Sequence, residues 1–231
     1  EIQGVILTVP NEQHLPVATA VAKAGKHIYT EKPIANTLEN GIRLEALQGE
    51  YGVQAMVGHS ARLLRGARMM KEAIDNGELG TLSFMESNFS NERALELTPD
   101  TWRWYRDKAP GGPLSQLATH LFDSLYMLGG PIEEVSSIAS KLSPVGAEVD
   151  DQSMTTLRFK SGALGYVGSC WTSPGIYFIR VYGQKGLMHF ELDFGSWDDP
   201  DRVHETSTLY IQRGKDGYGK REVLEMGASN M

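Results

Sequence analysis

A lysine at the end of a short strand is the first residue of this sequence that could do chemistry. Lys32 lies between Glu31 and Pro33, directly after the apolar-leaning run 28–30. A residue before proline is kept out of the helical region, so Lys32 is expected to point away from the strand tip. A partly desolvated lysine there titrates near neutrality, as proton transfer to or from a carbinol oxygen requires. The alternative is a surface lysine beside an acid, and these three residues alone favour it.

A second group of polar residues lies on a helix predicted for residues 113–128. Gln116, His120 and Asp123 are spaced as i, i+4 and i+7, beside a stripe of leucines at helical spacing. This arrangement predicts a polar face that points into a cleft. A single helical histidine is more often a hydrogen-bonded structural residue. Asp123 is either a partner that orients the His120 ring or an ordinary surface acid.

An aromatic and basic loop precedes that helix. Residues 101–106 read Thr-Trp-Arg-Trp-Tyr-Arg and stand before two glycines and Pro113. Exposed rings with arginine suggest a wall that faces a carbohydrate-like ligand or a cofactor. The other interpretation is that the two tryptophans anchor the loop to the core while the arginines pair with acids. His59, after the third strand, is likewise either a plain loop residue or a ligand contact.

The elements that must position these residues begin with an alternating pattern. Hydrophobic periodicity predicts strands at 4–9, 27–30 and 53–57 and helices at 14–24 and 37–50. Such alternation is typical of parallel sheets, in which ligands bind beyond the carboxyl ends of the strands. The polar groups after the first two strands are therefore expected at one ligand edge. This pattern predicts that residues 1–59 form the C-terminal half of a doubly wound (Rossmann) α/β domain.

Residues 60–231 predict a second domain of the α+β class. An amphipathic helix at 61–76 is followed by a strand at 82–89 and by the helix at 113–128. Further strands are predicted at 132–142, 152–159, 163–171, 176–183, 186–191, 207–213 and 221–225. The segments 183–186 and 214–217, each with glycine at both ends, have hairpin-turn chemistry. This order predicts a mostly antiparallel open sheet with the polar helix packed on one face.

The amino-acid composition limits the classes of partner that this protein could bind. The chain has 231 residues, 41% of them hydrophobic, and a net charge of -7, which argues against nucleic acid or an anionic membrane as a partner and favours small molecules. One cysteine, Cys170, excludes an internal disulfide framework and a cysteine-built metal cluster, and it fits a cytoplasmic location. No apolar run is long enough to span a bilayer. We expect no metal site.

The chain is expected to be a fragment that is truncated at both ends. Its first residues open directly into a core strand, residue 1 is not methionine, and the sequence holds no G-x-G-x-x-G turn for a pyrophosphate. Residues 227–231 show no structural signature. By itself the fragment is expected to bind a dinucleotide poorly and to be inactive.

Two strand ends carry a family resemblance. Thr8-Val9-Pro10-Asn11-Glu12-Gln13-His14 matches a T-x-P-N-x-x-H motif, and Glu31-Lys32-Pro33 matches an E-K-P motif. With these motifs the chain resembles the Gfo/Idh/MocA oxidoreductases, named for glucose-fructose oxidoreductase, inositol dehydrogenase and a rhizopine-catabolism protein. The resemblance implies that Lys32 is catalytic and near a nicotinamide. It also implies cofactor contacts by Thr8, Pro10, Asn11, His14, Glu31, Lys32 and Pro33.

The predicted helix at 113–128 matches the resembled family less closely than the two strand ends do. In the resembled family the catalytic helix follows paired glycines and usually carries Asp, three residues and then His; here His120 matches and Gln116 replaces the Asp. Glutamine can bind a hydroxyl or orient His120, but it cannot ionise. The family's W-R pair in the preceding loop implies a role for Arg103. We therefore expect Arg103, Gln116 and His120 to bind the substrate, with His120 also catalytic.

The resemblance implies an NAD- or NADP-dependent oxidoreductase that acts on CH–OH groups of a sugar, polyol or inositol-like compound. Lys32 would be the proton-transfer residue or its electrostatic partner, and His120 would take or give the carbinol proton. It also implies a homo-oligomer built through the C-terminal sheet. One alternative is a non-redox ligand-binding or regulatory relative, which Gln116 favours. The other is a dinucleotide-assisted glycosidase on the same scaffold.

Overall fold

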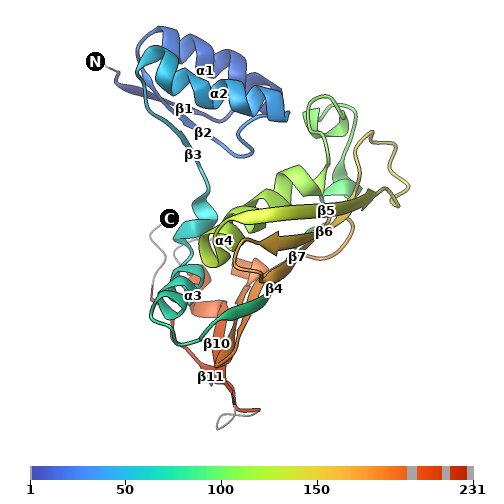
Figure 1. Ribbon diagram of the computed structural model, residues 1–231. Helices are drawn as coiled ribbons and strands as arrows, with labels where there is room; N and C mark the ends of the chain where they lie inside the picture. The colour runs from blue at the N-terminus through green and yellow to red at the C-terminus, as the bar shows by residue number, and fades with distance from the viewer. Residues whose placement is uncertain (1, 197–201, 215–218, 228–231) are drawn as a thin grey trace.

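The computed structural model describes residues 2–196, 202–214 and 219–227. The first part is a three-stranded parallel sheet of β1 (Gly4–Leu7), β2 (His27–Thr30) and β3 (Ala55–Val57), in that order. Two helices, α1 (His14–Lys23) and α2 (Leu38–Tyr51), cover one face of it (Figure 1). Leu7, Ile28 and Leu44 belong to the core that the sheet and helices share.

Local chemistry sets the bounds of α2. The Thr37 hydroxyl accepts a hydrogen bond from the backbone N–H of Asn40 at 3.2 Å, which satisfies one of the free donors of the first turn. Gly52 ends the helix in the left-handed region, with φ 66°. The predicted elements of residues 1–59 are confirmed, with β1 and β3 shorter than expected.

The second part is an eight-stranded sheet in the order β11-β10-β9-β8-β4-β7-β6-β5. β4 and β7 pair in parallel and all the other neighbours are antiparallel, so the predicted mostly antiparallel open sheet is confirmed. The strands are β4 (Leu82–Ser90), β5 (Ile132–Ser140), β6 (Gln152–Phe159), β7 (Leu164–Cys170), β8 (Ile176–Gly183), β9 (Gly186–Leu192), β10 (Thr208–Arg213) and β11 (Glu222–Val223).

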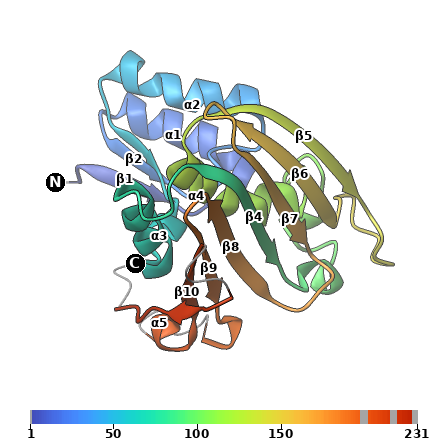
Figure 2. The same ribbon diagram turned by 60° about the horizontal axis from the view of Figure 1, so that its bottom comes forward.

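Helices cover one face of the large sheet only. α3 (Arg65–Asp75) and α4 (Thr119–Gly129) pack their buried side chains, among them Met70 and Leu121, against sheet residues such as Met85 and Phe159. Within the described ranges no helix lies on the other face, in front of β4 and β7 (Figure 2). The two sheets have separate cores. The separate cores support the proposal that residues 1–59 and 60–231 form two domains.

Two predicted helices differ from the structure. The helix expected at 61–76 is a 3₁₀ turn, η2 (Ser60–Leu63), followed by α3, because the buried Leu64 between them leaves the helical region, with φ -56° and ψ 125°. The helix expected at 113–128 begins with a π-helical turn, η5 (Leu114–Ala118), before α4. Neither break has a sequence signature, since both follow from tertiary contacts.

Smaller features complete the fold. Short 3₁₀ turns occupy η1 (Asn11–Gln13), η3 (Arg93–Glu96), η4 (Trp102–Trp104) and η6 (Phe194–Ser196), and α5 (Val203–Thr206) is a single helical turn. The hairpin at 183–186 is confirmed by the pairing of Gly183 with Gly186. Residues 215–217 of the other predicted turn lie outside the described residues. In the part of the chain that the structure describes, no helix has the length and apolarity needed to span a bilayer.

Candidate active site

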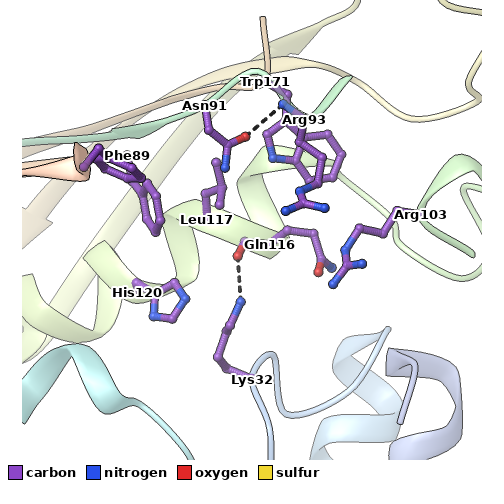
Figure 3. A pocket seen from close by; sticks show the side chains of 10 residues that line it. Lys32, Phe89, Asn91, Arg93, Arg103, Gln116, Leu117, His120 and Trp171 are labelled. Atoms are coloured by element: carbon purple, nitrogen blue, oxygen red, sulfur yellow. Dashed lines mark hydrogen bonds between the residues drawn. The ribbon is translucent and has the colours of Figure 1, made fainter. Parts of the chain in front are cut away.

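Lys32 and His120 converge on one cavity between the two sheets. The cavity, of about 280 Å³, is bounded by the loop after β2 and by the start of the helix η5–α4 (Figure 3). We call it the His120 cavity. Its lining residues are Lys32, Phe89, Asn91, Arg93, Arg103, Gln116, Leu117, His120, Trp171 and Phe194.

Lys32 leaves the end of β2 and reaches the helix of the other domain. Its Nζ donates a hydrogen bond to the backbone carbonyl of Gln116 at 2.9 Å (Figure 3). The Glu31 carboxylate accepts the backbone N–H of Lys32 at 3.1 Å. Burial lowers the pKa of Lys32 from 10.5 to about 8, opposed by the charge of Glu31 and assisted by those of Arg103 and Arg93. The amine therefore changes its protonation close to neutral pH.

A strained glycine turn begins the helix that meets Lys32. Gly112 has φ +47°, and a Cβ there would lie 2.0 Å from the carbonyl oxygen of Asp150, so only glycine fits. Pro113 follows it directly, and η5 then presents the Gln116 carbonyl to the Lys32 side chain. Single π turns in helices occur frequently at functional sites.

His120 lies on the first turn of α4, deep in the cavity. Its ring packs on Phe89 with the ring centroids 5.7 Å apart. Burial, with smaller effects of the nearby Lys32 and His59, lowers the pKa of His120 to about 3. The imidazole is therefore neutral at physiological pH, so it can accept one hydrogen bond and donate another.

Asp123 does not orient the His120 ring directly. Its carboxylate accepts two hydrogen bonds from Arg62 of η2, at 2.6 and 2.7 Å. His59 lies next to this pair, and its Nδ1 is 4.0 Å from Oδ2 of Asp123. Burial is the main cause that lowers the pKa of His59. His59 lines neither the His120 cavity nor the Asn11 cavity, and in its charged form it would lower the pKa of His120.

A second cavity adjoins the first and holds most of the predicted cofactor contacts. This cavity, also of about 280 Å³, is called the Asn11 cavity and is lined by Thr8, Val9, Pro10, Asn11, Glu31, Lys32, Trp102, Arg103 and Gln116. Three residues are common to both cavities: Lys32, Arg103 and Gln116. Among the described residues the buried amide nitrogen of Asn11 has no hydrogen-bond partner. Such a free donor fits a ligand with carbonyl or hydroxyl acceptors, as a nicotinamide riboside has.

Two of the predicted cofactor residues line neither cavity. His14 is almost fully buried, and its ring nitrogens lie 3.0 Å from the carbonyl oxygens of Pro33 and Val9. This ring therefore ties the loop after β1 to the loop after β2. Contact of His14 and Pro33 with a cofactor stays a prediction, and their observed role is to shape the two strand ends.

Sequence reasoning missed part of the cavity wall. Asn91 and Arg93, from the loop after β4, line the His120 cavity, and the Asn91 side-chain oxygen accepts the backbone N–H of Arg93 at 3.1 Å. No motif marks them, because their place depends on how β4 packs beside η5. Arg103, which was predicted, stacks its guanidinium over Trp102 at 4.2 Å and is half-buried.

The fold and the paired cavities define a protein with a dinucleotide-binding type of α/β domain followed by an open-sheet domain. Residues 1–59 match the model of the oxidoreductase family with an NAD-binding Rossmann fold, and residues 67–189 match that of the GFO/IDH/MocA C-terminal domain. The chain belongs to the Gfo/Idh/MocA family of oxidoreductases, so the expected resemblance is confirmed.

Relatives of known name agree with this family. The chain is similar to levoglucosan dehydrogenase of Pseudarthrobacter phenanthrenivorans, with 28% identity over 84% of this chain and 56% of the relative. It is also similar to myo-inositol 2-dehydrogenase of Thermotoga maritima, with 30% identity over 90% of this chain and 59% of the relative. The chain thus spans little more than half the length of these relatives.

A solved structure supports the fold over nearly the whole chain. It is a putative NADPH-dependent oxidoreductase from Desulfitobacterium hafniense, 39% identical, with a TM-score of 0.91 over 98% of this chain and 65% of that one. The fold class predicted from the sequence is therefore confirmed.

Proposed function

We propose that the whole protein is an NAD(P)-dependent dehydrogenase or reductase that acts on a CH–OH group of a sugar, polyol or inositol-like compound. The observation that carries this proposal is the convergence of Lys32 and His120 on one cavity, beside a second cavity that shares Lys32. Family membership supports the cofactor. The choice between NAD and NADP stays open.

The Asn11 cavity is the proposed nicotinamide site. Thr8, Pro10, Asn11 and Glu31 line it, and the unpartnered Asn11 amide offers a donor among the described residues. When bound, the nicotinamide supplies the hydride acceptor or donor. The proton transfer is then assigned to Lys32, with His120 beside it.

Lys32 is the proposed proton-exchange group. Because its pKa is about 8, both the amine and the ammonium are populated near neutral pH. The amine takes the hydroxyl proton when the substrate is oxidised, and the ammonium returns it when a carbonyl is reduced. The Gln116 carbonyl holds the Nζ at 2.9 Å and so fixes where the proton is exchanged.

His120 is the proposed partner of the same hydroxyl group. Its pKa of about 3 keeps the ring neutral, so a ring N–H can donate a hydrogen bond to the substrate hydroxyl oxygen without the ring carrying charge. The ring packs against Phe89, which limits its freedom to turn. His120 thus positions the hydroxyl group, whose proton passes to Lys32.

Turnover measurements test this function. The complete protein would be screened for cofactor reduction with sugars, polyols and inositols, and Lys32→Ala and His120→Ala would then be compared with Lys160→Ala, an exposed lysine on the β6–β7 turn. Removing a positioned acid–base group is expected to lower kcat by about 10²–10⁴-fold. The mechanism is wrong if both cavity variants retain turnover as the control does.

A non-redox relative is the second candidate, and Gln116 favours it. The buried Gln116 amide donates to the Ser115 hydroxyl at 3.3 Å and supplies no carboxylate to the His120 cavity. Calorimetry would decide between the two candidates. Saturable sugar and dinucleotide binding without any cofactor reduction in the screen would select the non-redox candidate.

We also propose a homo-oligomer built through the open face of the large sheet. The apolar side chains Ile138 and Met154, directly opposed on β5 and β6, are 71% and 54% exposed there. Leu164 on β7 extends the same exposed face. Burial of such a face by a second copy removes apolar surface from water. The free Cys170 supports the cytoplasm as the proposed location.

A further inference from the structure

Among the residues that the structure describes, the lining of the His120 cavity gathers positive charge without a matching acid. Lys32, Arg93 and Arg103 are among its ten lining residues, and none of those ten is Asp or Glu. His120 adds no negative charge either. The cavity is therefore cationic, although the chain as a whole has a net charge of -7.

Within the described part of the chain, the two arginines are not neutralised by neighbours. Among the described residues neither Arg93 nor Arg103 has a carboxylate within ion-pair distance, whereas Arg62 and Arg180 bind Asp123 and Glu86 at 2.6 and 2.7 Å. Burial, and then the charge of Arg93, lower the pKa of Arg103. The two guanidinium groups thus repel each other across the cavity wall, at a cost to the folded protein that a bound anion would relieve.

The same arrangement favours an anion over a neutral ligand. A cleft lined by one sign of charge concentrates ligands of the opposite sign. Guanidinium groups present paired N–H donors that match a carboxylate or a phosphate. The cavity volume of about 280 Å³ suits a compound of monosaccharide size.

We propose that the substrate of this site is an anionic sugar derivative whose carboxylate or phosphate is held by Arg93 and Arg103 while its reacting hydroxyl faces Lys32 and His120. This inference rests on the proposed function and narrows its substrate class. Arg93 is the deciding residue, because it lines the His120 cavity alone while Arg103 is shared with the proposed nicotinamide site.

Matched pairs of ligands test the inference by binding alone. The complete protein, saturated with its reduced cofactor, NADH or NADPH, so that no alcohol is oxidised, would be titrated with gluconate against sorbitol and with sorbitol 6-phosphate against sorbitol, and with inorganic phosphate as the minimal anion. The first pair tests a carboxylate and the second a phosphate. At least one anion is expected to bind about 10-fold more tightly than its neutral counterpart.

Variants assign the preference to Arg93. Arg93→Gln is expected to reduce the preference about 10-fold and Arg93→Lys to retain part of it. Arg68→Gln, which removes an exposed arginine of α3 that lines neither cavity, is expected to change nothing. In the unmodified protein, added salt should weaken binding of the preferred anion more than that of its neutral partner. The salt series tests the charge preference even if a variant folds poorly.

The outcomes separate this inference from the proposed function. It is overturned if no anion, phosphate included, binds more tightly than the neutral compounds, or if Arg93→Gln folds and keeps the full preference. Oxidation of a neutral polyol with no anion preference would overturn it and leave the proposed dehydrogenase intact. An Arg93-dependent anion preference without cofactor reduction in any assay would support it and contradict the redox function.

Discussion

At the scale of single residues, Lys32 determines the expected pH dependence of the reaction. Oxidation of a hydroxyl requires the amine form, so kcat/KM should rise with pH and level off above about 8, the pKa of Lys32. Reduction requires the ammonium form and should fall over the same range. A pH series in both directions measures this.

Lys32→Arg is the matched variant for the pH series. A guanidinium keeps its proton throughout the range. The variant should therefore turn over slowly, and its kcat/KM should no longer change with pH near 8, so that this limb of the pH profile is lost. If Lys32→Arg retains the same limb, another group titrates and the assignment is wrong. His120, with its pKa of about 3, is not expected to contribute a limb near neutrality.

The same lysine is expected to cost stability. A pKa lowered from 10.5 to about 8 means that the unfolded chain binds the proton more tightly than the folded protein, which costs roughly 3 kcal/mol at pH 7. Lys32→Met removes this cost and loses one hydrogen bond, worth about 1 kcal/mol. Denaturant unfolding should therefore show a gain of about 2 kcal/mol at pH 7.

The pH dependence of that gain checks its cause. Because the folded pKa is the lower one, the penalty is full below pH 8 and disappears as pH rises from 8 to 10.5. The advantage of Lys32→Met should shrink over that window. Lys160→Met, at an exposed position, should give no comparable gain. An equal gain at pH 7 and pH 10.5 would point to packing as the cause and contradict the electrostatic account.

Some residues of the site could be predicted from the sequence and others could not. Lys32, Asn11 and His120 were found because their motifs or helical spacing are local. Arg93 was missed, because it enters the cavity from the loop after β4, where no local pattern marks it. The pairing of Asp123 with Arg62 was also missed, since it joins residues 61 positions apart.

At the scale of elements, the turn before η5 is expected to tolerate no side chain at Gly112. A Cβ there would stand 2.0 Å from the Asp150 carbonyl, and φ is +47°. Gly112→Ala must move the backbone, and we expect a loss of about 3 kcal/mol or more in unfolding free energy. Activity should fall with it, because the Gln116 carbonyl then leaves its place beside Lys32.

Gly111→Ala is the matched control for that prediction. Its φ of +78° is equally unusual, but its Cβ would meet nothing closer than the Leu114 Cβ at 3.6 Å, an ordinary contact. The expected loss is about 1–2 kcal/mol, from backbone conformation alone. Equal losses in the two variants, measured by denaturant unfolding, would show that the close approach to Asp150 does not matter.

Elements were predictable where periodicity is strong and uninterrupted. β2, β6 and β8 have the predicted bounds, because alternation of buried and exposed residues is a local property. The π turn and the break at Leu64 were not predicted. Both arise where a helix meets another element, and the sequence of the helix alone does not contain that contact. The parallel pairing of β4 with β7 was not specified for the same reason.

At the scale of the whole molecule, the site exists only because two sheets meet. Lys32 and Gln116 are 84 positions apart in the chain, and their hydrogen bond joins the tip of a parallel sheet to a helix that covers the large sheet. A change in the relative position of the two parts would open both cavities at once, since Lys32 and Arg103 line both. Both cavities therefore depend on the contact between the two parts of the chain.

The open face of the large sheet gives the last prediction. Ile138 pairs with Met154 across β5 and β6, and both are largely exposed. If a second copy covers this face, Ile138→Glu buries an unpaired carboxylate in the interface and should weaken association about 10-fold or more. Light scattering over a concentration series would show the oligomer of the unmodified protein and its dissociation in the variant.

Leu38→Glu is the control, because Leu38 is 82% exposed at the start of α2, a helix that covers the three-stranded sheet and not the large one. An acid in the first turn of a helix is well tolerated, so this variant should fold and assemble as the unmodified protein does. A monomeric unmodified protein, or equal dissociation in both variants, would rule out this face as the interface. Turnover measured at each concentration would then show whether assembly matters to the site, which lies on the opposite side of the sheet with α4.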